Sequence, residues 1–402
     1  MKKSIETTTF LVKRFFPVLL VLLSFSACKK EKTEDAPIYN RDFKQSIIDS
    51  RKDLGNYLLT SSTPGISISV SVNGEIIYSE GLGLASKELN VPVKRNTKFR
   101  IGNTSQMFTS YLILKMQEQG LLDIDSSFYQ YIPNFPKKQF DFTLRQLAAQ
   151  TAGFPESVNE DFKNDKELRT LKDYVKKFEN DSLVYKPDTY SLKSDYSFAL
   201  LGILSENITK ENYIKLIRDM VMDTLRLSNT VPDNPFLIIT DRSEFYHRDY
   251  IARLMNAPET NLLPGVPAIG FLSTADNLNT AARAVLEPGF FSGKSIEMMV
   301  NPHKLESGQE LNRSFGWIAA TDHEGRKLIA QIGSTIGGSS AVVVYPEQKL
   351  VVSICANLGD DMQELPVLNI AARFLELPDK KENVTTDPTA DRENPEADGP
   401  AE

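Results

Sequence analysis

Two neutral amides stand at the start of a predicted helix, within the segment FRIGNTSQMFTS. Asn103 and Gln106 are three residues apart, so their side chains share one face of the first helical turn. A primary amide donates and accepts hydrogen bonds, but it neither attacks a carbonyl carbon nor takes up a proton near neutral pH. The chemistry predicted at this helix start is therefore hydrogen bonding without bond cleavage.

The helix that carries these amides belongs to a chain with a clear order of elements. The segment 65–83 alternates polar and apolar residues around Asn73-Gly74, which predicts a β-hairpin. Helical patterns occur at 104–119, 143–149, 168–178, 196–206, 213–222, 274–286 and 366–375. Strand-like runs occur at 314–320, 326–333, 340–346 and 349–357. Strands at both ends with helices between them predict an α+β fold, in which distant segments close an antiparallel sheet beside a helical lobe at roughly 110–265.

The N-terminus has the features of an export signal. A positively biased lead precedes an apolar run at 15–27, which is shorter than the ~20 residues that span a bilayer. Ser26 and Ala27 directly before Cys28 resemble the lipobox of bacterial lipoproteins, in which the cysteine is acylated. We expect a lipoprotein signal peptide at 1–27 and a flexible, charged tether at 28–45; the alternative is an uncleaved anchor with an incidental cysteine.

Composition narrows the classes of partner and cofactor. The 402 residues carry a formal net charge of -7 without a basic stripe, which argues against nucleic-acid binding. Cys28 and Cys355 are the only cysteines, so we expect neither a disulfide nor a cysteine-based metal site, and no cofactor. One large domain is predicted at 46–377, followed by a disordered, acidic and Pro-rich tail at 378–402.

Several segments resemble landmarks of one enzyme family. The run from Asn96 to Phe135 is similar to the nucleophile helix of the β-lactamase-related, penicillin-binding-protein-like serine hydrolases, which include class C β-lactamases, DD-peptidases and esterases. TLRQLAAQTAGFP, FALLGILSENITKENY, FLSTADNL, FGW and GGSSAVVVYPEQKLVVSICAN follow in the family's order. The resemblance implies a sheet with helices on both sides, a helical lobe, and a site in the cleft between them.

The family's first motif, S-x-x-K, supplies the serine nucleophile and the lysine base, and it corresponds here to Asn103 and Gln106. Both catalytic groups are thus replaced by amides. Ser105 is a nearby hydroxyl, but Phe108 stands three residues after it and accepts no proton. Ser105 is therefore interpreted mainly as a supporting hydroxyl at the helix start, with a rescued nucleophile as the alternative.

The other two motifs are also changed. The tyrosine and asparagine of Y-x-N correspond to Lys193 and Asp195, and the resemblance places K-T-G or H-T-G at 331–333, where Gln331 and Gly333 stand at its ends. Lys193 either serves as a desolvated base, or pairs with Asp195 or faces solvent. Gly333 is expected to keep the strand edge open to a ligand backbone.

Together, these replacements favour a non-catalytic protein, a pseudoenzyme, over an enzyme. We expect an exported, membrane-anchored lipoprotein of the cell envelope, on its periplasmic or surface face, that binds a peptidoglycan-like peptide, another small amide ligand or a protein partner. The alternatives are a divergent esterase, peptidase or β-lactamase-like hydrolase that uses Ser105 or Lys193, and a purely structural envelope protein. The sequence leaves the ligand and the oligomeric state open.

Overall fold

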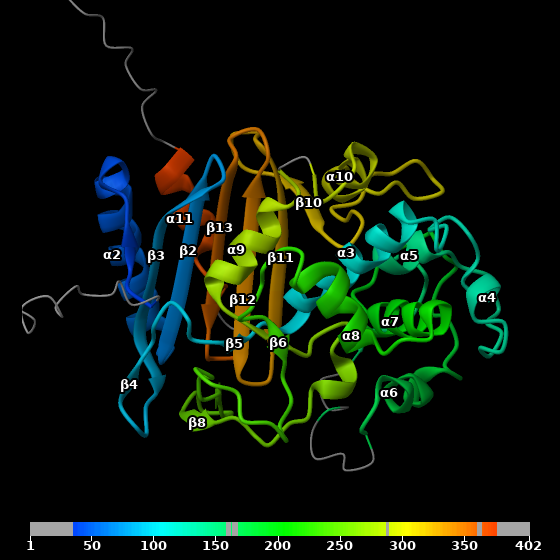
Figure 1. The fold of residues 1–402 in the computed structure, drawn as a ribbon, viewed down its shortest axis with the longest axis horizontal. Helices are drawn as coiled ribbons and strands as arrows, with labels where there is room; N and C mark the ends of the chain where they lie inside the picture. Colours follow the sequence, from blue (N-terminus) through cyan, green and yellow to red (C-terminus); the bar gives the residue numbers. More distant parts are fainter. Residues whose placement is uncertain (1–34, 158–161, 163–167, 287–288, 360–363, 376–402) are drawn as a thin grey trace, which may run out of the picture.

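One antiparallel sheet organises the computed structural model, which describes residues 35–157, 162, 168–286, 289–359 and 364–375. Its strands are β1 (Ile38–Tyr39), β2 (Gly65–Val72), β3 (Glu75–Ser86), β4 (Val91–Pro92), β10 (Ile318–Thr321), β11 (Lys327–Thr335), β12 (Gly338–Tyr345) and β13 (Leu350–Ala356). The order is β1-β3-β2-β13-β12-β11-β10, and β4 pairs with β3. The first and last thirds of the chain therefore meet in one sheet, as the sequence predicts (Figure 1).

The predicted β-hairpin is confirmed. Asn73 and Gly74 both have positive φ, of 51° and 82°, as a tight turn between two twisted strands requires. β2 also pairs with β13, for example Ile68 with Ile354, which joins residues almost 300 positions apart. This long-range pairing closes the sheet at its centre.

Helices cover both faces of the sheet. On one face lie α2 (Lys44–Ser61) and α11 (Val367–Leu375), and on the other lies α9 (Ala275–Arg283). Each face of the sheet packs on its own hydrophobic core. Residues of β13 contribute to both cores, because side chains alternate between the faces of a strand. Val352 and Ile354 join the core under α2 and α11, whereas Val351 and Cys355 join the larger core that continues into the helical lobe.

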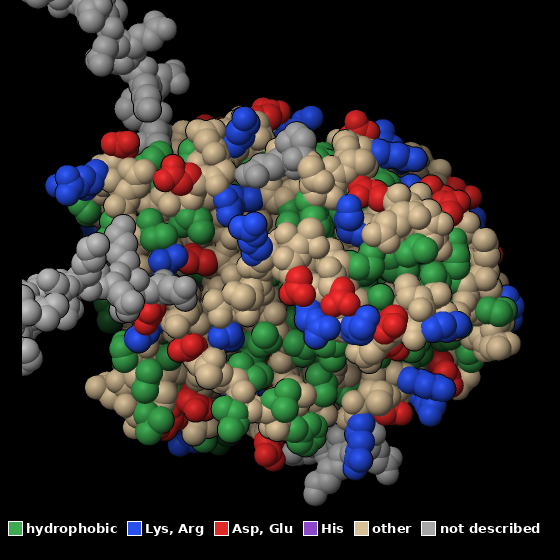
Figure 2. Space-filling model, in the orientation of Figure 1, with side chains coloured by type: hydrophobic (Ala, Val, Ile, Leu, Met, Phe, Trp, Pro, Cys, Tyr) green, Lys and Arg blue, Asp and Glu red, His purple; other side chains and the backbone are tan. Residues whose placement is uncertain are grey.

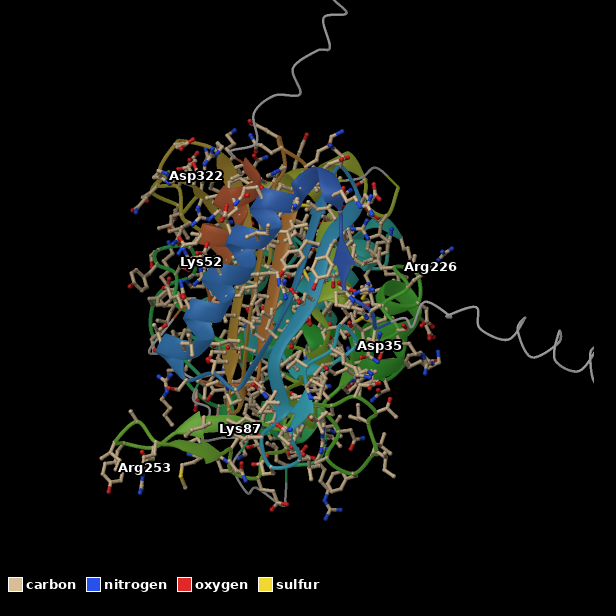
Figure 3. All side chains as sticks on the ribbon, turned by 90° about the vertical axis from the view of Figure 1, so that its left-hand side faces the viewer. Asp35, Lys52, Lys87, Arg226, Arg253 and Asp322 are labelled. Carbon is tan, nitrogen blue, oxygen red and sulfur yellow. The ribbon has the colours of Figure 1, made fainter. Side chains whose placement is uncertain are left out.

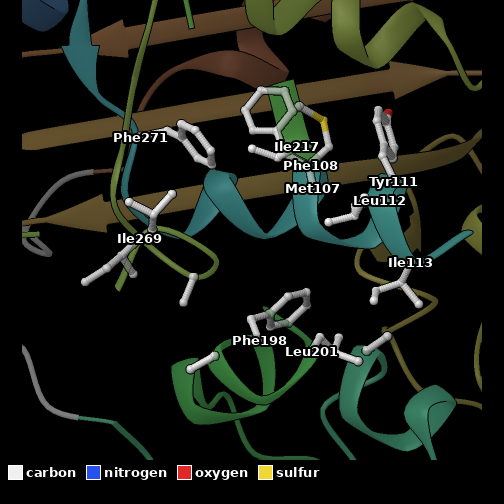
Figure 4. Close-up of a cluster of buried hydrophobic side chains, with 14 of the residues drawn as sticks. Met107, Phe108, Tyr111, Leu112, Ile113, Phe198, Leu201, Ile217, Ile269 and Phe271 are labelled. Atoms are coloured by element: carbon white, nitrogen blue, oxygen red, sulfur yellow. The ribbon is translucent and has the colours of Figure 1, made fainter. Parts of the chain in front are cut away.

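The helical lobe is built around one long buried helix. Its helices are α3 (Ser105–Glu118), α4 (Phe128–Tyr131), α5 (Leu144–Ala148), α6 (Leu171–Phe178), α7 (Asp195–Thr209), α8 (Tyr213–Ile217) with the π-helical turn Arg218–Met222, and α10 (Gly293–Val300). Figure 4 shows Met107 and Phe108 of α3 beside Phe271, with Phe198 and Leu201 of α7 nearby. Since nearly every side of α3 is buried, this helix is held firmly where the lobe meets the sheet.

Several short elements have no counterpart in the sequence patterns. They form the small sheet β5-β9-β6 (Phe99–Arg100, Phe271–Ser273, Val231–Pro232) and the hairpin of β7 (Tyr246–Arg248) and β8 (Leu254–Asn256). Strands of two or three residues show too little alternation to be recognised. The helices α2 and α10 likewise have no predicted counterpart. The strands β6, β7 and β8 lie within 110–265, the range for which a helical lobe is expected.

The predicted terminal segments are only partly visible. Residues 35–45 of the expected tether are structured: β1 pairs with β3, and α2 begins at Lys44. The signal peptide at 1–27, the remainder of the tether with Cys28, and the tail at 378–402 lie outside the described residues. Within the described ranges, no helix has the length and apolar character needed to cross a membrane.

Candidate functional site

The two amides lie where a tight turn leads from β5 of the small sheet into α3. Gly102 begins a 3-10 turn at Gly102–Thr104 with a φ of 52°, and a Cβ atom there would collide with the backbone of Ser334 on β11. Only glycine combines this backbone conformation with so close an approach. Asn103 and Gln106 follow on the 3-10 turn and the first turn of α3, both almost fully buried.

Both amides bind the same carboxylate oxygen. Asn103 Nδ2 donates a hydrogen bond of 2.6 Å to Asp195 Oδ1, and Gln106 Nε2 donates one of 2.9 Å to the same atom. Asp195 is the first residue of α7, and its backbone N–H donates to Ser157 Oγ at 3.1 Å. Gln150 Nε2 completes the network by donating to Gln106 Oε1 at 2.9 Å. The resulting cluster, Asn103, Gln106, Gln150, Ser157 and Asp195, is called the amide cluster below.

Burial dominates the electrostatics of the amide cluster. Loss of water raises the pKa of the Asp195 carboxyl above its ordinary value, because the charged form is disfavoured in an apolar surrounding. The Ser157 hydroxyl, the charge of Lys193 and the two amides each lower this pKa, but their combined effect is smaller. Asp195 is therefore a buried acid solvated mainly by neutral donors.

The strand positions of the third motif lie at the same junction. Gln331 Nε2 on β11 donates to the backbone carbonyl of Gly316, so its amide is bound within the protein. Gly333 lies against the backbone of Ile101, and a Cβ atom there would come within 2.6 Å of Thr104 N. Contrary to the expectation of an edge kept open for a ligand, the small size of Gly333 lets the 3-10 turn pack onto β11.

Ser105 and Lys193, the two candidate residual catalytic groups, lie in different surroundings. Ser105 is fully buried, and its Oγ accepts a hydrogen bond of 3.3 Å from Phe271 N on β9. Lys193 is exposed to solvent, and it acts on Asp195 through its charge. The two groups therefore do not form a nucleophile and base pair within the amide cluster.

The histidines do not join the amide cluster. His303 Nε2 lies 2.7 Å from Asp188 Oδ1, which also accepts a hydrogen bond from Thr151, so His303 connects its loop to the loop that carries Asp188. His247 belongs to β7, and His323 is largely exposed. Among the described residues, no group of three or more His, Cys, Asp or Glu side chains is placed to hold a metal ion. Cys355 is buried, and burial raises the pKa of its thiol.

Two members of the amide cluster lie outside the three motifs. Gln150 stands in LAAQTAGFP, where the resemblance implies a histidine in a mainly structural position near the cleft. Ser157 carries no pattern that distinguishes it from other loop serines. Each becomes recognisable only when the fold places it beside Gln106 or Asp195.

Comparisons with known proteins agree with this architecture. The chain belongs to the beta-lactamase family, whose model matches residues 46–376. Protein flp of Staphylococcus aureus (strain N315) is 26% identical over 313 residues, and the match covers 74% of this chain but only 60% of flp. The crystal structure of FmtA from Staphylococcus aureus is similar with a TM-score of 0.71 and 20% identity, over 86% of this chain and 93% of that chain. A class C beta-lactamase is similar with a TM-score of 0.67 and 18% identity, over 83% of this chain and 96% of that chain.

Proposed function

We propose that this chain is a non-hydrolytic member of the beta-lactamase family that is exported, anchored to a membrane through Cys28, and binds its ligand without cleaving it. One observation carries the proposal. Asn103 and Gln106 both donate to Asp195 Oδ1, so the positions that hold nucleophile and base in active relatives are occupied by amides bound to a buried carboxylate. Neither amide can act as the nucleophile that forms an acyl-enzyme, and neither takes up a proton near neutral pH.

The buried carboxylate strengthens this argument. In a family enzyme the lysine must lose its proton to act as a base, but a carboxylate at hydrogen-bonding distance stabilises the protonated form of a lysine. Asp195 would therefore disable a lysine at position 106 even if one were present. Asp195 is compatible with two amide donors, but it is not compatible with a lysine that must lose its proton to act as a base.

The proposed ligand is a peptidoglycan-like peptide or another small molecule that carries amide groups, with a protein partner as the alternative. The family fold supports such a ligand by analogy. Export and anchoring are supported by the apolar run at 15–27 and by the small residues before Cys28.

The proposal is tested by labelling the purified full-length protein with a fluorescent penicillin and a fluorophosphonate. We expect no covalent labelling by either probe under conditions in which a DD-peptidase forms a stable acyl-enzyme with the fluorescent penicillin. Stoichiometric labelling that disappears in Ser105→Ala would establish the divergent hydrolase instead. Binding is tested separately by thermal shift with muropeptides, since a ligand that binds the folded state raises the melting temperature.

Rebuilding the motif tests the role of Asp195. We expect the double variant Asn103→Ser, Gln106→Lys to remain unlabelled, because Asp195 keeps the new lysine protonated. Adding Asp195→Asn removes the negative charge, and the triple variant is expected to react with the fluorescent penicillin. If the double variant is labelled as strongly as the triple variant, Asp195 does not control the protonation of the lysine.

A further inference from the structure

Large apolar side chains are exposed on projecting loops at one end of the molecule. The loop after β6 presents Phe236, Leu237 and Ile238 in succession, and Ile238 is 99% exposed. The tip of the β7–β8 hairpin presents Tyr250, which is 95% exposed, and Ile251. A run of exposed hydrophobic residues on a folded domain marks a surface that meets a partner or a membrane.

A third apolar turn lies beside this hairpin. Leu89, between β3 and β4, and Val91, the first residue of β4, are exposed. Glu88, which precedes Leu89, accepts a hydrogen bond of 2.6 Å from the Tyr246 hydroxyl of β7. On the other side, Lys98 N donates to Asp241 O, three residues after Ile238. The three loops, 87–91, 235–241 and 249–255, are called the apolar end below. Figure 2 shows hydrophobic side chains along the lower part of the molecule, in the region of β4 and β6.

The described chain begins next to the apolar end. Asp35 Oδ2 lies 2.8 Å from Lys94 Nζ, just after β4, and Arg95 Nη1 donates to the carbonyl of Ala36 at 2.9 Å. Cys28 precedes Asp35 by seven residues, and seven residues span at most about 25 Å. A lipid on Cys28 would therefore hold the bilayer within that distance of β4.

We propose that the apolar end rests on the lipid membrane, with its three loops inserted at the boundary between headgroups and acyl chains. This inference rests on the proposed lipid anchor at Cys28. Aromatic and aliphatic side chains on projecting tips suit that boundary, where apolar groups leave water while neighbouring polar groups stay hydrated.

Charged side chains of both signs surround the loops. Lys87, Arg242 and Arg253 are exposed beside the apolar residues, and Figure 3 shows Lys87 and Arg253 at the same end of the molecule. Arg253 pairs with Asp249 at 2.8 Å, and Asp241 and Glu244 are also exposed. This charged rim suits the headgroup layer, where long basic side chains stay hydrated while the apolar tips go deeper.

Tryptophan reporters test the proposal on the full-length protein, reconstituted into vesicles of phosphatidylethanolamine and phosphatidylglycerol. The single native tryptophan, Trp317, is buried, so Ile238→Trp and Tyr250→Trp each add one exposed reporter. Leu121→Trp, which follows α3 in the helical lobe, is the matched control at another exposed apolar residue. Brominated lipid should quench roughly half of the added emission at positions 238 and 250, because the interface admits groups to about 5–10 Å depth. Brominated lipid should leave the emission of the tryptophan at position 121 unchanged.

Flotation of the same vesicles separates this proposal from the proposed anchor. Protein that floats with the vesicles but shows no quenching at 238 and 250 is anchored without docking, which overturns the inference while leaving the anchor intact. Quenching equal to that at 121 overturns it as well. A blue shift at 238 or 250 that grows with protein concentration in the absence of lipid would assign the apolar end to a contact between two copies. Selective quenching at 238 and 250 supports docking.

Discussion

Asp195 and Asp233 are both buried aspartates, but the protein stabilises them in different ways. Asp233 Oδ2 accepts a 2.6 Å hydrogen bond from Arg100 Nε, and the two side chains are only 2% and 6% exposed. Asp195 receives its short hydrogen bonds from the neutral amides Asn103 and Gln106. One acid therefore lies in a buried ion pair, and the other lies among amides.

The difference separates a structural contact from a candidate functional one. Arg100 belongs to β5, and its pairing with Asp233 joins the small sheet to the segment after β6, while its Nη1 also donates to Ile336 O at 2.8 Å. The charge of that aspartate is compensated within the scaffold. At Asp195 burial raises the pKa because neutral donors offset desolvation less completely than a cation does. A folded protein can stabilise a buried aspartate with a cation or with neutral donors, and at Asp195 the neutral donors leave the pKa raised.

The largest expected effect comes from breaking the ion pair. Arg100→Met leaves Asp233 buried without its cation, and we expect the free energy of unfolding to fall by about 3–5 kcal/mol. The control is Arg145→Met, which removes a largely exposed pair with Asp125 and should cost about 0–1 kcal/mol. Urea denaturation measures both variants. Equal losses in the two variants would contradict the distinction between buried and surface pairs.

A smaller effect is expected from removing an amide donor. Asn103→Ala takes away one of the two short hydrogen bonds to Asp195 Oδ1, and the free energy of unfolding should fall by about 1–3 kcal/mol. The same change in an Asp195→Asn background should cost less, since a neutral acceptor gains less from a donor than a carboxylate does. Urea denaturation of the four proteins gives the coupling. A coupling of zero would mean that the charge on Asp195 has no part in the contact.

The smallest effect concerns pH. Since burial raises the folded-state pKa of Asp195 above 3.8, the folded state binds its proton more readily than the unfolded chain does. The stabilising contribution of that proton is fully present below pH 3.8 and is lost as the pH rises through the raised pKa. Relative to Asp195→Asn, the wild type should therefore gain stability as pH falls across this window, by at most about 1.4 kcal/mol per pH unit. Chemical denaturation at several pH values measures the difference; parallel curves would exclude the effect.

Local patterns were sufficient for part of the fold. The β2–β3 turn could be predicted because Asn73 and Gly74 both tolerate positive φ, and α3, α7 and β11 to β13 could be predicted because their apolar periodicity extends over many residues. The small sheet β5-β9-β6 could not be predicted. Its strands are two or three residues long, and they are paired by the tertiary structure rather than by any local preference.

The amino-acid sequence specifies which chemical groups are available at the site: amides at 103 and 106, a carboxylate at 195, and neither a lysine nor a serine at the two motif positions. The packing of the folded chain brings one oxygen of Asp195 to both amides, adds Gln150 to the network, and turns Ser105 toward β9. The physical reason is distance along the chain. Asn103 and Asp195 are 92 residues apart, so their hydrogen bond depends on how α3 and α7 pack, which no local pattern specifies.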